Sequence, residues 1–330
     1  MDGLLIVDKP AGPTSHDVVL RMRRALGEKR IGHTGTLDPA ATGVLGLVLG
    51  RATRLAQFLT TSDKSYEAVV RFGFATDTGD AQGRVTGPSC TGAMPSRAEI
   101  DAALEAFRGT FLQQPPAFSA KKVAGKRSHE VARARVRDAR LKPPDPTDLP
   151  GLPDPGLPAP ASVTAYRIEV LRIEDDRVTL LVDCSAGFYV RALAHDLGQR
   201  LGVGAHLASL RRMRSGDFGL DRAITLDVAE RNPDRARVAL IAPHDMLPRL
   251  PTFSLSAEGV RRAVNGCALG PRDSVTGQSE VPNPQSNPQS AIRNPQCLVR
   301  LLDPTGELVG IGRPSPAGRP GLLHPSVVLM

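Results

Sequence analysis

The chain has 330 residues, of which 41% are hydrophobic, so it is long enough for two domains and for a sizeable core. Lys and Arg number 42 against 34 Asp and Glu, and the formal charge of +8 favours an anionic partner without restricting the fold. There is no apolar run of about 18 residues, and acidic residues stand where a signal peptide needs basic ones, so we expect a cytoplasmic protein without a membrane span.

The N-terminal part predicts two strands with a helix and a loop between them. Residues 4–7 and 44–49 are short apolar runs, as expected of buried strands. Residues 15–26 have the spacing of an amphipathic helix capped by Thr14 or Ser15, and its apolar positions are Val18, Val19, Met22 and Leu26. Residues 31–43 are rich in Gly, Thr and Pro, so we expect a loop there.

The middle of the chain predicts further strands and helices. Residues 66–74 alternate between apolar and polar and predict a strand, whereas 97–107 predict an amphipathic helix. Residues 168–182 predict a hairpin that turns at 174–176, and 189–201 predict another helix. Because the elements mix without a regular strand–helix alternation, we expect an α+β fold.

Two segments cannot contribute to a regular core, and the C-terminal part is rich in short strands. Residues 142–160 contain eight prolines, which exclude a helix or a central strand. Residues 297–302 and 308–311 predict strands on either side of a turn at 303–306. The degenerate Asn-Pro-Gln repeat in 282–296 predicts a disordered insertion.

Positive charge is concentrated between residues 121 and 140. This segment has eight basic residues against two acidic ones, a local net charge of +6. Such a density is typical of a surface that contacts a phosphate backbone. A solvated basic helix face explains the charge equally well.

The cysteines give no evidence of a metal site or a disulfide framework. Cys90, Cys184, Cys267 and Cys297 are too far apart in the sequence for a zinc knuckle, and we expect reduced thiols. We therefore expect no metal.

The segment Gly32–Leu45 is the most distinctive in the chain. Its glycines permit tight turns, and Pro39 biases Asp38 toward an extended conformation, so Asp38 is expected on a shaped loop that leads into an apolar strand. Catalytic groups are often placed on such loops. From composition alone, an Asp-Pro turn with His33 as a surface or capping residue is the simpler interpretation. The segment lacks Gly-Lys-Ser/Thr and is no Walker phosphate loop.

The order of residues in this segment resembles the signature of the TruB family of tRNA pseudouridine synthases, including its dyskerin relatives. The matching residues are Gly-His-Thr-Gly-Thr-Leu-Asp-Pro, then Ala-Thr-Gly and Leu45. The resemblance extends over residues 3 to about 220, and its flanking segments are Gly3–Pro10, Ser62–Tyr66, Cys184–Arg191 and Gly204–Arg212. It implies that Asp38 is the essential catalytic residue. It also implies a pseudouridine synthase fold, with a central mixed, mainly antiparallel sheet flanked by helices.

The resemblance assigns four further positions to the active site. It implies that Tyr66 stacks on the target base and that Tyr189 and Arg191 lie in the site. Leu210 falls where the family has an active-site leucine. Judged without the family, each tyrosine is more typical of a core residue, and Arg191 of a surface arginine near a helix N-terminus. Paired with Asp38, Arg191 would keep the carboxylate ionised and oriented.

The resemblance also implies base flipping. The target uridine lies in a folded tRNA loop, and taking it out of the stack costs a few kcal/mol. His33 is nominated to fill the vacated space, although it would serve equally as a hydrogen-bonding residue of its own loop. Lys9, which precedes Pro10, is expected to orient the active-site loop.

The chemistry implied by the resemblance is an isomerisation without a cofactor. The C1′–N1 bond breaks, the uracil rotates, and C1′ joins C5, so no redox change occurs. Asp38 would act as a nucleophile at the sugar or the ring, or as the base that removes a ribose proton. All of these roles require an ionised carboxylate.

The basic segment resembles the family's RNA-gripping insertion, here about residues 115–140. The residues expected to contact RNA phosphates are Lys121, Lys122, Lys126 and Arg127. Three positions depart from the family: His129 stands where a tyrosine is usual, Gly46 where proline is frequent, and the stretch 142–160 replaces a shorter basic connection.

The resemblance divides the chain into a catalytic domain, residues 1–248, and a PUA-like RNA-binding module, residues 249–330. We expect a monomer that acts on the T stem-loop of tRNA at uridine 55 without an obligatory protein partner. Two alternatives are an RNA-guided synthase of the dyskerin type and a non-catalytic RNA-binding protein. The short N-terminus and modest C-terminal module argue against the first, and the presence of Asp38, Tyr66 and Arg191 argues against the second.

Overall fold

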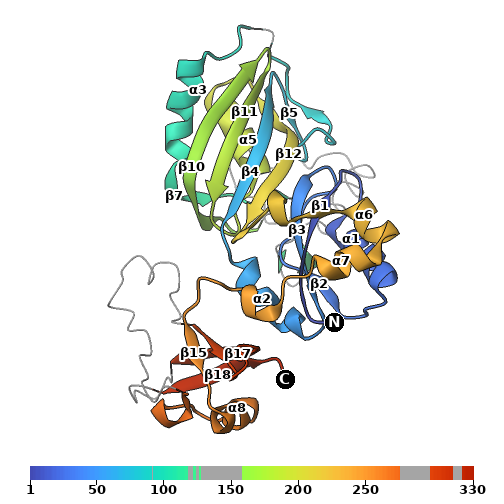
Figure 1. The fold of residues 1–330 in the computed structure, drawn as a ribbon. Helices are drawn as coiled ribbons and strands as arrows, with labels where there is room; N and C mark the ends of the chain where they lie inside the picture. Colours follow the sequence, from blue (N-terminus) through green and yellow to red (C-terminus); the bar gives the residue numbers. More distant parts are fainter. Residues whose placement is uncertain (91, 118–121, 124–125, 128–157, 276–297, 315–321) are drawn as a thin grey trace. The chain divides into compact units, whose positions relative to one another are not determined.

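The computed structural model describes residues 1–90, 92–117, 122–123, 126–127, 158–275, 298–314 and 322–330 (Figure 1). The chain forms two compact units, each described by itself below. The first comprises residues 1–39, 43–60 and 217–330, and the second comprises 40–42 and 61–216. Within the described ranges, no helix is long and apolar enough to cross a membrane.

The first unit is built on strands from the N-terminal part of the chain. Strand β1 (Gly3–Lys9) pairs in parallel with β14 (Ile224–Thr225) and antiparallel with β3 (Thr42–Leu49). Strand β2 (Ile31–His33) pairs antiparallel with β3. The expectation of a loop over all of residues 31–43 was therefore wrong at both ends, because the backbone ladder to β3 forms although the sequence there is rich in Gly and Thr.

Helix α1 (Ser15–Leu26) has the predicted bounds. Thr14 is its N-cap, and the Thr14 and Asp17 side chains form a capping box. The helix ends at Gly27, whose φ of 66° is the left-handed conformation that glycine adopts without strain. It packs against two short helices that the sequence did not reveal, α6 (Leu226–Arg231) and α7 (Pro233–Val238).

The C-terminal residues form a four-stranded sheet within the first unit. Its order is β15 (Thr252–Ser254), β16 (Val299–Leu302), β17 (Leu308–Pro314) and β18 (Leu323–Val328). The predicted turn between β16 and β17 is present, and the Asp303 side chain accepts hydrogen bonds from the Thr305 and Glu307 backbone nitrogens. The sheet packs in the same unit with helix α8 (Ala257–Val264).

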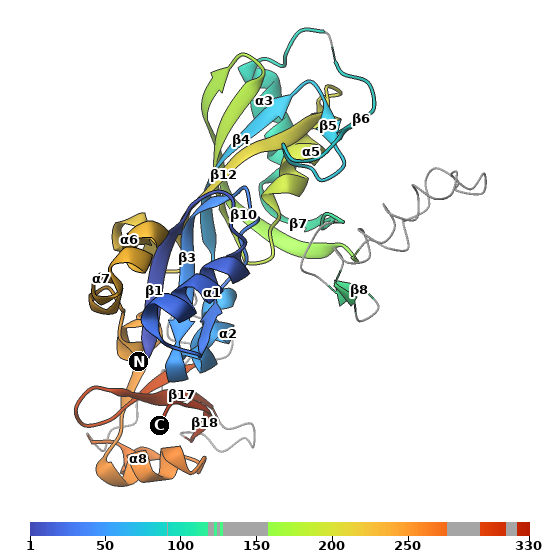
Figure 2. The same ribbon diagram turned by 90° about the vertical axis from the view of Figure 1, so that its right-hand side faces the viewer.

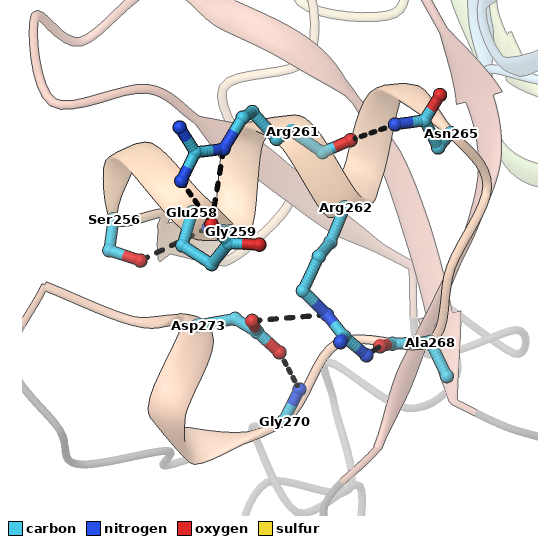
Figure 3. Close-up of polar contacts among 9 residues, drawn as sticks. All are labelled: Ser256, Glu258, Gly259, Arg261, Arg262, Asn265, Ala268, Gly270 and Asp273. Atoms are coloured by element: carbon cyan, nitrogen blue, oxygen red, sulfur yellow. Dashed lines mark hydrogen bonds and ion pairs between the residues drawn. The ribbon is translucent and has the colours of Figure 1, made fainter.

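Figure 3 shows how α8 is fixed to the following turn. Asp273, which is 7% exposed, accepts a bond from the Gly270 nitrogen and pairs with Arg262 at 3.2 Å. Gly259 allows the close approach, because a Cβ there would lie 2.3 Å from the Asp273 carbonyl oxygen.

The second unit is an antiparallel sheet with helices on one face (Figures 1 and 2). Its strand order is β12 (Ala205–Ser215), β4 (Lys64–Phe72), β11 (Arg177–Cys184), β10 (Ala161–Glu174) and β7 (Gly109–Gln113). Strand β4 starts two residues earlier than predicted, and it also ends two residues earlier because Gly73 turns the chain with a φ of 104°. The predicted hairpin is confirmed as β10 and β11.

Helices α3 (Arg97–Leu104) and α5 (Val190–Arg200) pack against this sheet and contact each other. Apart from 3-10 turns, the remaining described elements are short: α2 (Ala56–Thr60), β5 (Ala75–Thr76), β6 (Val85–Thr86), β8 (Lys122–Val123), β9 (Lys126–Arg127) and β13 (Phe218–Gly219). The predicted α+β class is confirmed. The repeat at 282–296 and nearly all of the proline-rich stretch lie outside the described residues.

Candidate active site

Asp38 lies in the loop that connects β2 to β3, at residues 34–41. Its side chain is half-buried. The residues on either side of it, Leu37 and Pro39, are both held by hydrogen bonds to groups outside the loop. The backbone of the loop is therefore fixed on both sides of the predicted catalytic carboxylate.

The preceding residue is fixed by helix α1. Leu37 donates its backbone N–H to the Ser15 hydroxyl at 2.8 Å, and the same hydroxyl donates to the Leu37 carbonyl at 3.0 Å. Ser15 is 2% exposed and Leu37 is 3% exposed. The N–H and carbonyl of Leu37 are therefore bonded to the Ser15 hydroxyl in a region that is closed to water.

The following residue is fixed by β1 and the turn after it. The Pro39 carbonyl accepts from Lys9 Nζ at 3.1 Å and from the Gly12 nitrogen at 2.8 Å. Gly12 has a φ of 109°, which a glycine tolerates. Lys9, the last residue of β1, is fully buried and also donates to the Pro10 carbonyl at 2.9 Å. Lys9 thus contacts the loop that it was predicted to orient.

His33 lies at the end of β2, and its half-buried side chain precedes the loop. The next residue, Thr34, donates its N–H to the Gly46 carbonyl at 2.9 Å. A Cβ at Gly46 would lie 2.6 Å from Thr34 Oγ1, so the glycine found at this position in place of the family's frequent proline lets the Thr34 side chain approach β3. The inserting role of His33 stays a prediction.

In the second unit, Tyr66 lies on β4 and is 9% exposed. Two residues earlier on the same face is Lys64, directly opposite Cys184 on β11. Burial, together with the nearby Arg212 charge, lowers the pKa of Lys64 to about 8. Burial likewise raises the pKa of the Cys184 thiol to about 12. Cys184 is therefore a protonated core residue.

Arg191 is the second residue of α5 and is 7% exposed, so the alternative of a surface arginine is wrong. Its guanidinium donates to the Thr78 carbonyl at 3.1 Å and lies 4.0 Å from an Asp80 carboxylate oxygen. The other Asp80 oxygen accepts from the Thr78 hydroxyl at 2.7 Å and from the Gln82 nitrogen at 3.0 Å. The predicted pairing of Arg191 with Asp38 stays a prediction.

Asp80 was missed in the sequence. The run Asp77-Thr78-Gly79-Asp80 has the composition of an ordinary turn, and only its Asx-type side-chain contacts distinguish it. In the structure this turn is seated on β12, where the Ala81 nitrogen donates to the Leu207 carbonyl at 3.0 Å.

Tyr189 and Leu210 are held through their backbones. The buried Gln113 side chain donates to the Tyr189 carbonyl at 3.0 Å and accepts from its nitrogen at 2.8 Å. The Leu210 carbonyl on β12 accepts from Thr42 Oγ1 at 3.4 Å. Thr42 is the residue with which the chain leaves the Asp38 loop for β3, and residues 40–42 belong to this second unit.

Of the predicted RNA-contacting residues, Lys121 lies outside the described part of the chain. The other three lie on strands β8 and β9, which pair antiparallel with Lys122 opposite Arg127 and Val123 opposite Lys126. Among the residues that the structure describes, no three His, Cys, Asp or Glu side chains gather as metal ligands.

Comparison with known proteins gives consistent matches. Residues 23–144 match the model described as TruB family pseudouridylate synthase, N-terminal domain, and residues 191–237 match the tRNA pseudouridylate synthase B C-terminal domain. The chain is 41% identical over its full length to the full length of tRNA pseudouridine synthase B from Solibacter usitatus. It is 43% identical to the enzyme of that name from Aromatoleum aromaticum, over 78% of this chain and 77% of that one.

Solved structures agree on the fold. The crystal structure of a Cbf5-Nop10-Gar1 complex contains a chain that is 26% identical, with a TM-score of 0.69. The match covers 99% of this chain and 85% of that one. The structure of an H/ACA RNP bound to a substrate RNA contains a chain with the same fold, at 24% identity and a TM-score of 0.67.

Proposed function

Because the chain belongs to the TruB family of pseudouridylate synthases, and is thus an isomerase, we propose that it converts uridine 55 in the T loop of tRNA to pseudouridine with Asp38 as the catalytic carboxylate. The observation that carries this proposal is the anchoring of Leu37 by Ser15 and of Pro39 by Lys9 and Gly12. Such anchoring on both sides is what a carboxylate needs if it is to meet a reacting sugar or ring in one geometry.

For this reaction the protein has to orient the nucleotide and supply an ionised carboxylate. The C1′–N1 bond breaks and the C1′–C5 bond forms, so atoms and electrons balance within the nucleotide and no cofactor is required. An ionised Asp38 serves each of the roles open to it, as a nucleophile at the sugar or the ring or as a base toward a ribose proton. The uridine must leave its stack to react, at a cost of a few kcal/mol.

The remaining site residues have roles in holding the flipped base. Tyr66 would stack on the uracil, a contact worth roughly 1–3 kcal/mol, and His33 would fill the space that the base leaves. Tyr189 and Leu210 line the site. Arg191 keeps the catalytic carboxylate charged. Lys9 orients the Asp38 loop, and its bond to the Pro39 carbonyl supports this role.

The substrate is tRNA rather than a guided RNA. Support comes from the full-length identity to an enzyme named tRNA pseudouridine synthase B, compared with only 26% identity to the chain of the Cbf5-Nop10-Gar1 complex. We propose a cytoplasmic monomer with a catalytic domain at residues 1–248 and a PUA-like module at 249–330.

The test is tritium release from tRNA that carries 5-tritiated uridine, with no guide RNA and no added cofactor. Wild type should release tritium, and the product should map to position 55. Asp38→Asn, which keeps the size of the side chain but removes its charge, should release none while its tRNA affinity stays within about twofold of wild type. Turnover by Asp38→Asn at the wild-type rate would refute the assigned role. Release by neither protein would favour a guided complex.

A further inference from the structure

We infer that Ser15 is a positioning residue for Asp38, acting through the backbone of Leu37. The inference rests on the proposed function, since it assumes that Asp38 is the catalytic group. The segments quoted for the family resemblance, among them Gly3–Pro10 and Gly32–Leu45, do not include Ser15. Its position at the start of α1 suggests at first sight only a helix-terminal serine.

The Ser15 hydroxyl makes two bonds to one residue. It accepts from the Leu37 nitrogen at 2.8 Å and donates to the Leu37 carbonyl at 3.0 Å. A hydroxyl has one proton and two lone pairs, so both bonds can exist at once. The Ser15 side chain therefore gives Leu37 the pair of backbone hydrogen bonds that a residue in a sheet receives from a neighbouring strand.

The consequence for Asp38 follows from peptide geometry. The Leu37 carbonyl belongs to the planar peptide group that also contains the Asp38 nitrogen. Holding that carbonyl fixes the plane on the N-terminal side of Asp38. On the other side, the ring of Pro39 restricts its own φ, and its carbonyl is held by Lys9 and Gly12. The direction in which the Asp38 side chain leaves the backbone is thereby determined.

The helix does not need Ser15 for its own cap. Thr14 accepts from the Asp17 nitrogen at 3.0 Å, and Asp17 in turn accepts from the Thr14 nitrogen at 2.8 Å. Thr14 is exposed, whereas Ser15 is 2% exposed and points to the loop. The Thr14 hydroxyl thus caps the helix and the Ser15 hydroxyl holds the loop, so the two roles can be tested by separate substitutions.

Ser15→Ala removes both bonds and leaves the buried N–H and carbonyl of Leu37 without their partner. The loop then relaxes, and we expect the single-turnover rate of tritium release to fall roughly 10- to 100-fold, the effect of a reacting group displaced by about 1 Å. The Kd for tRNA should stay within about twofold. Ser15→Thr keeps the hydroxyl and should recover most of the rate.

Thr14→Ala is the matched control. It breaks the capping box of the same helix and should lower the melting temperature by a few degrees, as Ser15→Ala does, but it does not touch Leu37. Measured well below the melting temperatures, its single-turnover rate should equal that of wild type.

Equal rates for Ser15→Ala and Thr14→Ala would overturn the inference, because the effect of Ser15 would then be one of stability alone. So would a Ser15→Thr protein that melts like wild type but reacts as slowly as Ser15→Ala. Asp38→Asn is assayed in the same series. If Asp38→Asn is inactive and Ser15→Ala reacts normally, only the inference fails, whereas an active Asp38→Asn means that the proposed function itself fails.

Discussion

Buried polar side chains around the candidate site bond chiefly to backbone groups of other segments. Ser15 holds Leu37, Gln113 holds Tyr189, and Arg191 holds the Thr78 carbonyl. Bonds of this kind satisfy polar groups that would be costly to bury alone, and they fix loop backbones without depending on the side chains of the loop. The site residues are thus supported by neighbours that carry no chemistry themselves.

Asp80 offers a test of this support at the residue scale. It is the carboxylate beside Arg191, with an exposure of 17% for its side chain and 8% for that of Arg191. Asp80→Asn keeps an oxygen for Thr78 and Gln82 but removes the charge that Arg191 faces. Without that charge the Arg191 guanidinium is held less firmly, so the rate of tritium release should fall roughly tenfold, or about 1.4 kcal/mol in the barrier, with unchanged tRNA affinity.

Asp77→Asn is the control for that variant. Asp77 lies in the same turn, but its side chain accepts from the Arg84 nitrogen at 2.8 Å, a bond that the asparagine oxygen can also accept. It should therefore react at the wild-type rate. Equal losses in the two variants would mean that the turn as a whole matters and the charge at position 80 does not.

At the scale of elements, close packing in the second unit depends on small residues at crossings. A Cβ at Gly198 in α5 would lie 2.2 Å from the Ala205 backbone nitrogen at the start of β12. The next residue of that strand is His206, whose ring stacks on the Phe74 ring at a centroid distance of 4.6 Å and whose Nδ1 lies 3.2 Å from the Phe74 carbonyl oxygen. These contacts hold together the segments from which the Asp80 turn and Arg191 extend.

Strands β8 and β9 carry the predicted RNA contacts, and salt dependence tests them. Lys122→Glu combined with Arg127→Glu changes two residues that are paired in the register of these strands. If both contact phosphates, tRNA binding should weaken, and the slope of log Kd against log salt should decrease by about 1.4, or about 0.7 for each lost contact. Arg231→Glu, an exposed change on α6, is the control and should leave the slope unchanged. An unchanged slope in the double variant would locate the phosphate contacts elsewhere.

At the scale of the whole molecule, the C-terminal sheet is part of the core of the first unit. Leu308, Ile311 and Leu329 pack in one buried cluster with residues of β1 and β3. On the other side of β17, Val309 joins a second cluster with α8. The last strands therefore connect the small module to the N-terminal strands through shared apolar burial.

Leu329→Asp tests this connection. Leu329 is 4% exposed, and its nitrogen donates to the Val309 carbonyl at 2.8 Å. A carboxylate there loses the apolar contacts and is poorly solvated, so the free energy of unfolding should fall by about 3 kcal/mol or more. Thermal unfolding should show a melting temperature lower by several degrees. Met330→Asp, at a neighbouring residue that is 50% exposed, should melt like wild type, and equal melting of both variants would contradict the shared core.

Elements with a local sequence pattern could be predicted from the amino-acid sequence. The bounds of α1, the hairpin of β10 and β11 and the turn at Asp303 follow from apolar spacing, capping residues and turn chemistry, all of which act over a few residues. The family could also be recognised from the sequence, because the motif around Asp38 is long and specific. The fold class followed from both.

The contacts that hold these elements in place are visible only in the folded chain. Strand β2 forms because β3 offers it a ladder, although its own residues predict a loop. Ser15, Gln113 and Asp80 gained their partners from segments 22, 76 and 111 positions away in the chain. A side chain that bonds to a distant backbone leaves no pattern in the sequence, since every residue offers the same N–H and carbonyl.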